Sequence, residues 1–266
     1  MSSARKPGTV LITGGTGGIG SALVETFRGF GDEVWFTDPG TPPATTGTGP
    51  GLRAFQLDLT SYASVQQFVA DLPGTPDILI HNAALGSATV KRLTEAAHEQ
   101  DRLMFQVNAV GILWLNRLLV PRMVARNSGK IVLFSSVGGG ITIFPGFSYA
   151  DAMSKAAVAT LGRALAADLA PTGVDVFTVC PGATRTPMFE ASTLAALSPQ
   201  QRRDLIGSLP GGRLVEPAEI ADLVAYMCTD AGKILRGAVI DASLGLGVNP
   251  GMLAEGSRAG AAGMAR

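Results

Sequence analysis

The chain has 266 residues, of which 46% are apolar and 16% are charged, so it can bury a sizeable core and does not resemble a disordered chain. Its 21 basic and 21 acidic residues cancel, which removes the electrostatic basis for binding nucleic acid or an anionic membrane surface. No secretory segment, spanning apolar run or metal-ligand spacing is found, and Cys180 and Cys228 lie far apart, so we expect a soluble, cytoplasmic protein without a metal.

Short β-branched or aliphatic runs alternate with helix-compatible stretches along most of the chain. The predicted strands are Thr9–Thr13, Glu33–Thr37, Arg53–Leu57, Asp77–His81, Lys130–Ser135, Asp175–Val179 and Ala238–Asp241. The predicted helices are Ile19–Phe30, Ser64–Leu72, Thr94–Arg126, Ser154–Ala170 and Pro217–Thr229. Strands that are apolar at consecutive positions are buried on both faces of a parallel sheet. The pattern predicts a single doubly wound α/β domain of Rossmann type with a mainly parallel, seven-stranded sheet.

We expect this domain to occupy residues 9–243, after an N-terminal arm of residues 1–8. The segment Pro39–Gly51 is rich in proline and glycine, which cannot support a helix, so the second crossover is predicted to be a coil. Residues 244–266 are rich in glycine and alanine and are predicted to form a mobile tail. A tail that packs over a neighbouring subunit is the alternative.

A glycine-rich motif, TGGTGGIG, follows the first predicted strand and opens the first predicted helix. Gly14 permits a tight turn, Gly18 lets the backbone approach a pyrophosphate, and Gly20 allows close helix–strand contact. The helix N-terminus offers unpaired N–H groups to phosphates. A turn without a ligand is the alternative, but the acid Asp38, 18 residues after Gly20, favours a dinucleotide site.

Asp38 ends the second predicted strand, where a carboxylate accepts hydrogen bonds from ribose hydroxyls and repels a 2′-phosphate. Gly17, Pro39 and Gly40 stand where a phosphate-binding cation would be expected. The cofactor is therefore predicted to be NAD and not NADP. A plain turn residue before Pro39 is the alternative for Asp38.

From about Thr9 to Asp241 the ordered motifs resemble those of the classical short-chain dehydrogenase/reductase family. They are TGGTGGIG, LDL at Leu57–Leu59, HNAA at His81–Ala84, the NAVG that begins at Asn108, the GKIVLFSS that ends at Ser136, PGATRTPM at Pro181–Met188, and RLVEPAEIADLVAYM and VIDAS near the end. The chain departs from the family's NNAG at His81 and Ala84, and Ala242 and Ser243 replace two usual glycines.

The resemblance implies hydride transfer between a nicotinamide cofactor and a carbonyl or secondary alcohol. The implied cofactor-binding residues are Gly14, Thr16, Gly17, Gly18, Ile19, Asp38, Asp58, Leu59, Asn82, Ala83, Ala84, Tyr149, Lys155, Pro181, Gly182, Thr184 and Thr186. Within this set, Asp58 would contact the adenine amine and Thr186 would lie near the nicotinamide carboxamide.

The implied catalytic residues are Asn108, Ser136, Tyr149 and Lys155. Asn108 would help to hold a proton-relay water, Ser136 would bind the substrate oxygen, and the Lys155 ammonium would lower the pKa of a tyrosine from its usual value near 10. Structural alternatives remain for single residues: Asn108 could kink a helix, Ser136 could satisfy a backbone group, and Pro181–Gly182 could be a simple turn.

The acid/base position is where the chain departs most from the family, whose spacing is YxxxK. This chain reads YADAMSK, Tyr149–Lys155, so counting back four from Lys155 reaches Asp151. Counting forward about 13 from Ser136, the family's interval, reaches Tyr149. On one helix, residues i and i+4 lie about 40° apart, whereas i and i+6 lie about 120° apart.

Two arrangements are therefore open. If Asp151 fills the tyrosine position, its carboxylate beside Lys155 would be ionised at neutral pH and a poor proton donor, and the enzyme would be damaged or repurposed. If Asp151 caps the helix, Tyr149 lies just outside it and could reach the nicotinamide. We prefer the second, which predicts an NAD-dependent dehydrogenase with Tyr149 as acid/base.

Two rival functions come from other classes: an NAD-binding sensor that has lost redox activity, and a non-redox lyase or isomerase on the same scaffold. The expected substrate is a small apolar or cyclic alcohol or ketone, because the predicted walls of the site are apolar. Packing of a core or lid is the alternative role for these apolar residues. The residues of the predicted walls are Ile141, Ile143, Phe144, Pro145 and Phe147 after Ser136, and Met188, Phe189, Leu194, Leu197, Leu205, Ile206 and Leu209 after Thr186.

The resemblance also implies a homodimer or homotetramer that pairs through the fourth and fifth helices. The candidate residues for that face are Leu113, Trp114, Leu118, Val158, Leu161 and Leu165. Burial in the core is the alternative for several of them.

Overall fold

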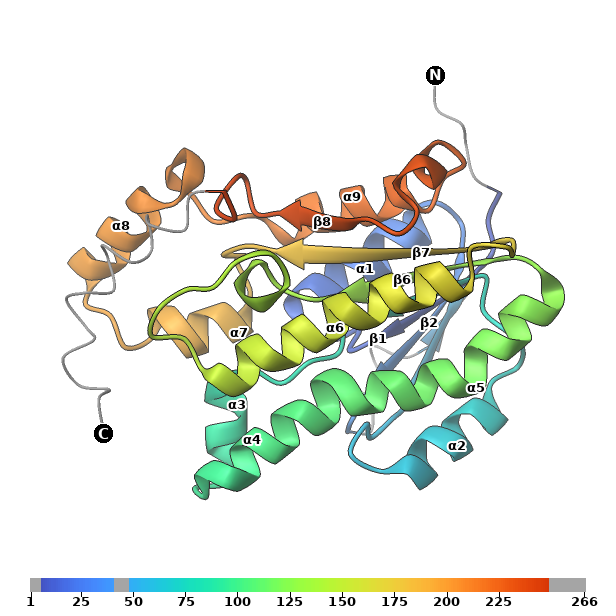
Figure 1. Cartoon of the computed structure of the whole chain (residues 1–266), viewed down its shortest axis with the longest axis horizontal. Coiled ribbons are helices and arrows are strands. Elements are labelled where there is room, and N and C mark those ends of the chain that lie inside the picture. The colour runs from blue at the N-terminus through green and yellow to red at the C-terminus, as the bar shows by residue number, and fades with distance from the viewer. Residues whose placement is uncertain (1–5, 41–47, 249–266) are drawn as a thin grey trace.

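A twisted parallel sheet forms the centre of the protein, whose computed structural model describes residues 6–40 and 48–248 (Figure 1). The parallel strands are β1 (Thr9–Thr13), β2 (Glu33–Asp38), β4 (Leu52–Gln56), β5 (Ile78–His81), β6 (Gly129–Phe134), β7 (Val174–Pro181) and β8 (Val239–Ala242). The strand order is β3-β4-β2-β1-β5-β6-β7-β8. This arrangement confirms the predicted Rossmann-type fold with seven parallel strands.

The eighth strand, β3 (Thr48–Gly49), is a two-residue addition that pairs antiparallel with β4 at the edge of the sheet. It lies inside the stretch predicted to be a coil, of which residues 41–47 fall outside the described residues.

Helices cover both faces of the sheet (Figure 1). Their bounds are α1 (Gly18–Gly29), α2 (Tyr62–Asp71), α3 (Ser87–Leu93), α4 (Ala97–Phe105), α5 (Gly111–Arg126), α6 (Tyr149–Asp168), α7 (Pro187–Phe189), α8 (Pro199–Ser208) and α9 (Pro217–Met227). The short α3, α7 and α8 are not predicted from the sequence. A π-helical turn, η1 (Gln106–Val110), divides the helix that was predicted as continuous over Thr94–Arg126.

Neighbouring strand residues belong to two separate cores, which explains their consecutive apolar pattern. Leu11 and Leu79 pack with α2, α5 and α6, whereas Ile12 and Ile80 pack with α1 and α9. Each sheet face is therefore closed by its own helices.

By length and composition alone, the run Ala97–Arg126 is apolar enough to cross a membrane, but 50% of its most apolar window is buried inside the protein. Its inner face supplies Leu115 and Leu119 to the core, so a core helix accounts for the composition.

Several residues of the predicted pairing face are only half-buried: Leu113, Trp114, Leu118, Leu161 and Leu165. Val158 is buried in the core, which was the alternative to a place on the pairing face.

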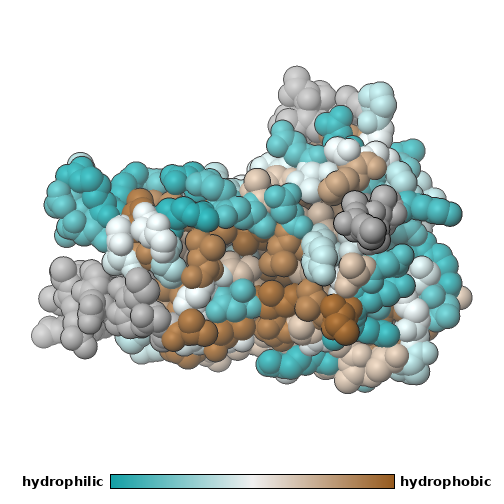
Figure 2. Space-filling view, turned by 90° about the horizontal axis from the view of Figure 1, so that it is seen from above, coloured by the Kyte–Doolittle hydropathy of each residue, from teal (hydrophilic) through white to brown (hydrophobic). Residues whose placement is uncertain are grey.

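A second apolar surface lies near β8, the edge strand at the opposite side of the sheet from β3. Figure 2 shows apolar residues across the middle of the face seen from above, and Ile141, Leu244 and Val248 are exposed. The assembly itself stays a prediction.

Candidate active site

Glycine residues shape the turn between β1 and α1. Gly14 has φ +67°, which favours glycine, and a Cβ there would lie 2.9 Å from the Ala83 backbone, so the turn packs directly against the segment after β5. Asn82 braces the turn, because its Nδ2 donates to the carbonyl oxygens of Thr13 (3.1 Å) and Gly14 (2.9 Å). Gly17 caps α1 without a side-chain hydrogen bond, and the first turn holds no acidic residue. This helix N-terminus can therefore receive a phosphate.

The ends of β2 and β4 hold two carboxylates beside this turn. Asp38 accepts a hydrogen bond from the Thr16 hydroxyl at Oδ2, and its Oδ1 accepts one from the Gly40 N–H over 3.1 Å. Asp58 Oδ1 accepts from the N–H and the hydroxyl of Thr60, over 2.8 and 2.7 Å. Both carboxylates are thus held in defined orientations.

The loop after β7 closes against the glycine-rich turn. Thr184 Oγ1 donates to the Gly182 carbonyl over 3.0 Å, and Thr186 Oγ1 accepts from the Phe189 N–H over 3.1 Å, which caps α7. A Cβ at Gly18 would lie 2.8 Å from the Thr186 side chain. Gly18 therefore makes room for this loop, and its approach to a pyrophosphate stays a prediction.

Ser136 follows β6 and caps the short turn η2 (Val137–Ile141), where its Oγ accepts a hydrogen bond from the Gly138 N–H over 3.2 Å. Within the described part of the chain no acceptor takes the Ser136 hydroxyl hydrogen, so it can be donated to a ligand oxygen. The neighbouring Ser135 donates its own hydroxyl to the Lys155 carbonyl over 2.8 Å, which ties β6 to α6.

Asn108 lies in the π turn η1 and is buried. Its Nδ2 donates to the Leu85 carbonyl (3.0 Å) and to Ser154 Oγ (3.2 Å), while its Oδ1 accepts from the Leu85 N–H (2.7 Å). Ser154 in turn donates to the Asp151 carbonyl oxygen over 2.8 Å. Asn108 thus joins α3 and its preceding loop to the start of α6, and its role toward a water stays a prediction.

The start of α6 corrects one expectation from the sequence. Ser148 caps the helix, because its Oγ accepts from the Asp151 N–H over 3.3 Å, and Tyr149 is the first helical residue. The prediction that Asp151 caps the helix, with Tyr149 just outside, is therefore wrong. Ser148 and Asp151 both have side chains suited to a cap, and the backbone turns into the helix three residues earlier than the Asp151 cap requires.

Asp151 and Lys155 lie one helical turn apart and interact through their charges. Burial raises the pKa of the Asp151 carboxyl, and the Lys155 ammonium opposes that rise. Burial lowers the pKa of Lys155, and the charges of Asp151 and Cys180 oppose that fall. Asp151 Oδ1 is buried and has no hydrogen-bond partner among the described residues. Tyr149, in contrast, is 87% exposed.

These segments surround one cavity of about 980 Å³. All the predicted cofactor-binding residues line it, together with Ser136 and Asp151. Of the predicted site residues, Asn108 is the exception, since it supports the wall from behind. The cavity brings the glycine-rich turn, Asp38 and the loop after β7 to the same space as Ser136 and Lys155.

Part of the predicted apolar wall lines this cavity, namely Ile143, Phe144, Pro145, Phe147, Met188 and Phe189. The others do not; Leu194 and Leu209 are buried in a separate small core with Leu197, Leu205 and Ile206 against them, as the packing alternative held.

The cavity is also lined by residues that were not predicted from the sequence, namely Leu85, Thr89, Leu93 and Leu246. The spacing of Val90 and Leu93 could have indicated the short α3. Leu246 belongs to the predicted tail, yet it is buried; residues 249–266 lie outside the described residues.

Comparison with known proteins gives consistent matches over nearly the whole chain. A family model described as enoyl-(acyl carrier protein) reductase matches residues 14–247. An uncharacterised short-chain type dehydrogenase/reductase, y4mP of Sinorhizobium fredii, is 32% identical over 261 residues, which are 92% of this chain and 97% of that protein.

Two solved structures were determined with different nicotinamide cofactors. A 3-oxoacyl-[acyl-carrier protein] reductase of Brucella melitensis with bound NAD has a TM-score of 0.76 and 27% identity, and covers 91% of this chain and 92% of its own. A variant of actinorhodin polyketide ketoreductase with NADPH has a TM-score of 0.77 and 25% identity, and covers 92% of this chain and 99% of its own.

Proposed function

We propose a function from one premise: the chain belongs to the short-chain dehydrogenase/reductase family of oxidoreductases, which bind a nicotinamide cofactor. On that basis the protein is an NAD(H)-dependent oxidoreductase that interconverts a secondary alcohol and a ketone. The observation that carries this proposal is the shared cavity, in which the glycine-rich turn and Asp38 adjoin Ser136 and Lys155.

The residues of the cavity fit a dinucleotide. The N-terminus of α1, which has no side-chain cap and no acidic residue in its first turn, suits a pyrophosphate, and the carboxylate of Asp38 suits ribose hydroxyls. When bound, the nicotinamide would accept or supply the hydride. Ser136 would donate its hydroxyl hydrogen to the substrate oxygen and so orient the reacting carbon. An acid/base is also needed, and Tyr149 and Asp151 both line the cavity.

The choice of NAD over NADP rests on Asp38. Two hydrogen bonds, from Thr16 and from the Gly40 N–H, hold its carboxylate at the end of β2. A 2′-phosphate there would meet this negative charge in a partly enclosed cavity, at a cost of about 1–3 kcal/mol. The Brucella and actinorhodin relatives carry NAD and NADPH respectively, so the family admits either cofactor.

We predict that Asp38→Ala lowers the preference for NAD over NADP, chiefly because the variant binds NADP more tightly than the wild type does. We expect the wild-type protein to bind NAD about tenfold or more tightly than NADP, and the ratio to fall toward one in the variant. Isothermal titration calorimetry with both cofactors measures this directly. Asp222→Ala, which removes an exposed carboxylate on α9 outside the cavity, is the matched control. Equal or tighter NADP binding by the wild type would contradict the proposal.

The substrate is proposed to be a small apolar or cyclic alcohol or ketone. Ile143, Phe147 and Met188 expose apolar surface at the cavity. A panel of secondary alcohols with NAD, followed by absorbance of the reduced nicotinamide, tests the reaction. A protein that binds NAD but oxidises none of them would favour a sensor, and substrate turnover without reduced nicotinamide would favour a lyase or isomerase.

A further inference from the structure

We propose that Asp151, and not Tyr149, is the acid/base at the substrate oxygen, with Lys155 as its partner cation. This inference rests on the proposed function and names the proton-transfer group of that reaction. Asp151 and Lys155 are four positions apart in an unbroken helix, so both side chains lie on one face of α6. Both residues line the cavity together with Ser136.

Tyr149 is placed differently from this pair. It is the first residue of α6, six positions before Lys155, which separates the two side chains by about 120° around the helix axis. Its side chain is 87% exposed, so the phenol lies at the rim of the cavity. The Lys155 ammonium acts on Asp151, one turn away.

Hydrogen bonds to its backbone hold Asp151 at the wall of the cavity. Its backbone is fixed on both sides, by the Ser148 hydroxyl at its N–H and by the Ser154 hydroxyl at its carbonyl. Asn108 in turn fixes Ser154. Oδ1 is buried, has no hydrogen-bond partner among the described residues and is closed to solvent. Asp151 nevertheless lines the cavity, so a substrate oxygen would approach its carboxyl group from the cavity side.

Burial and a neighbouring charge act in opposite directions on Asp151. Burial raises the pKa of the Asp151 carboxyl above its ordinary value, and the Lys155 ammonium opposes that rise by favouring the ionised form. On the other elements packed against this part of α6, Cys180 of β7 acts on Lys155, and Asp241 of β8 acts on Cys180. The expectation of a carboxylate too acidic to donate therefore leaves out the effect of burial.

The proton and electron balance is complete with the proposed cofactor. In alcohol oxidation, the Asp151 carboxylate takes the hydroxyl proton while the carbinol C–H bond breaks and its electron pair leaves as hydride to the nicotinamide. The carbon–oxygen double bond forms, and protonated Asp151 releases its proton to water. In reduction, the Asp151 carboxyl donates its proton to the substrate oxygen as the hydride arrives at carbon.

Four variants test this assignment by kinetics. Asp151→Asn should lower kcat by about 100-fold or more, whereas Tyr149→Phe should change it by about threefold or less. Asp151→Tyr should recover at least about tenfold over Asp151→Asn, with a pH profile moved to higher pH, because a phenol titrates above a carboxyl. Asp168→Asn, at the exposed far end of α6, is the matched control. Calorimetry of NAD binding checks that each variant is folded and retains cofactor affinity.

A titration without cofactor or substrate gives a second readout. With ¹³C-labelled aspartate, one carboxyl resonance should titrate above the ordinary range of aspartate, vanish in Asp151→Asn, and move to still higher pH in Lys155→Met. Loss of turnover in Tyr149→Phe with activity kept in Asp151→Asn would overturn the proposal, as would an ordinary Asp151 titration. Absence of NAD binding or of any hydride transfer by the wild type would instead overturn the proposed function.

Discussion

His81, at the end of β5, shows how one buried side chain sets a pH dependence. The imidazole is fully buried, and its Nε2 lies 3.0 Å from Asn116 Oδ1. Burial lowers the pKa of His81 from 6.5 to about 4, because the hydrogen bond to Asn116 only partly offsets the loss of hydration of the charged form. Nδ1 of His81 and Nδ2 of Asn116 have no partner among the described residues, so no further hydrogen bond from them offsets the burial of the pair.

We predict that this histidine makes the protein less stable in mild acid. The unfolded chain takes up a proton at His81 below about pH 6.5, while the folded chain does so only near pH 4, so stability falls as the pH drops through that window. The loss should reach up to about 3 kcal/mol at its lower end. Urea unfolding of wild type and His81→Asn at several pH values checks this. The dependence of the free energy of unfolding on pH should become weaker in His81→Asn. It should persist in His98→Asn, whose imidazole is exposed.

At the scale of elements, the approach of α6 to β7 determines where Asp151 and Lys155 lie. Gly162, near the middle of α6, makes that approach possible, because a Cβ there would lie 2.0 Å from Thr178 Oγ1. Thr178 is buried within β7. A residue larger than glycine must therefore push the helix or the strand away.

Gly162→Ala is predicted to lower the free energy of unfolding by about 1–3 kcal/mol, as overpacking usually does. Gly207→Ala is the matched comparison, since Gly207 is also helical, in α8, and a Cβ there would meet no atom within 4 Å. That change should be neutral or stabilise the protein by up to about 1 kcal/mol. Chemical denaturation of both variants measures the difference, and equal effects would contradict the packing argument.

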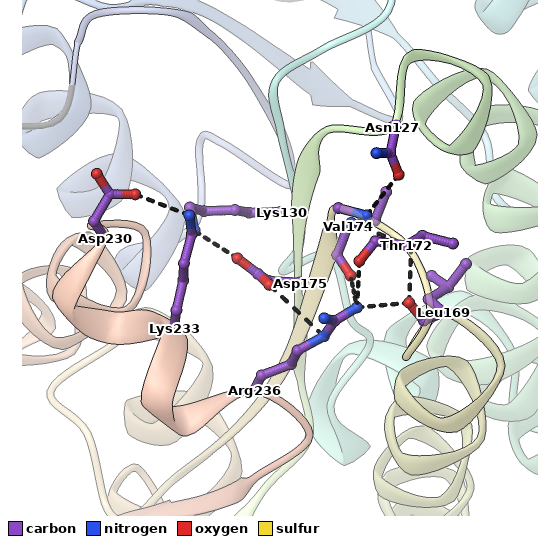
Figure 3. A network of polar contacts seen from close by, with 10 residues as sticks. Asn127, Lys130, Leu169, Thr172, Val174, Asp175, Asp230, Lys233 and Arg236 are labelled. Atoms are coloured by element: carbon purple, nitrogen blue, oxygen red, sulfur yellow. Dashed lines mark hydrogen bonds and ion pairs between the residues drawn. The ribbon is translucent and has the colours of Figure 1, made fainter.

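At the scale of the whole molecule, a polar network ties the sheet to the ends of distant elements (Figure 3). Asp175 of β7 pairs with Lys130 of β6 over 2.9 Å and with Arg236 over 3.7 Å, and the Asp175 side chain is only 8% exposed. The Arg236 guanidinium also donates to the carbonyls of Leu169 and Thr172, which follow α6. The network joins two strands, the end of α6 and the segment before β8.

Removal of the Asp175 carboxylate, which lies at the centre of this network, should therefore lower the free energy of unfolding strongly. Asp175→Ala leaves Lys130, whose side chain is 13% exposed, without its partner, and we expect a loss of about 3–5 kcal/mol. Asp230→Ala removes the partner of Lys233 in an exposed pair and should cost less than about 1 kcal/mol. Thermal and urea unfolding of both variants test this contrast. Similar small losses would show that the Asp175 network contributes little.

The sequence alone determined the parallel sheet. β1 was predicted with its observed bounds, because strands buried on both faces must be apolar at consecutive positions. Gly14 and Asp38 were singled out by the spacing of a short motif, and Thr186 by the family resemblance; all three line one cavity, and their roles toward a cofactor stay predictions. Local sequence carries such information directly.

Only the tertiary structure decided that α6 begins at Tyr149 after the Ser148 cap, that a π turn surrounds Asn108, and that Leu93 and Leu246 form part of the cavity wall. Ser148 and Asp151 can both cap a helix, so local preference leaves the start of α6 open. Contacts made through Asn108 and Ser154, and through Ser135 and Lys155, hold the helix in the observed position. These contacts join residues 20 to 46 positions apart, and no local pattern specifies them.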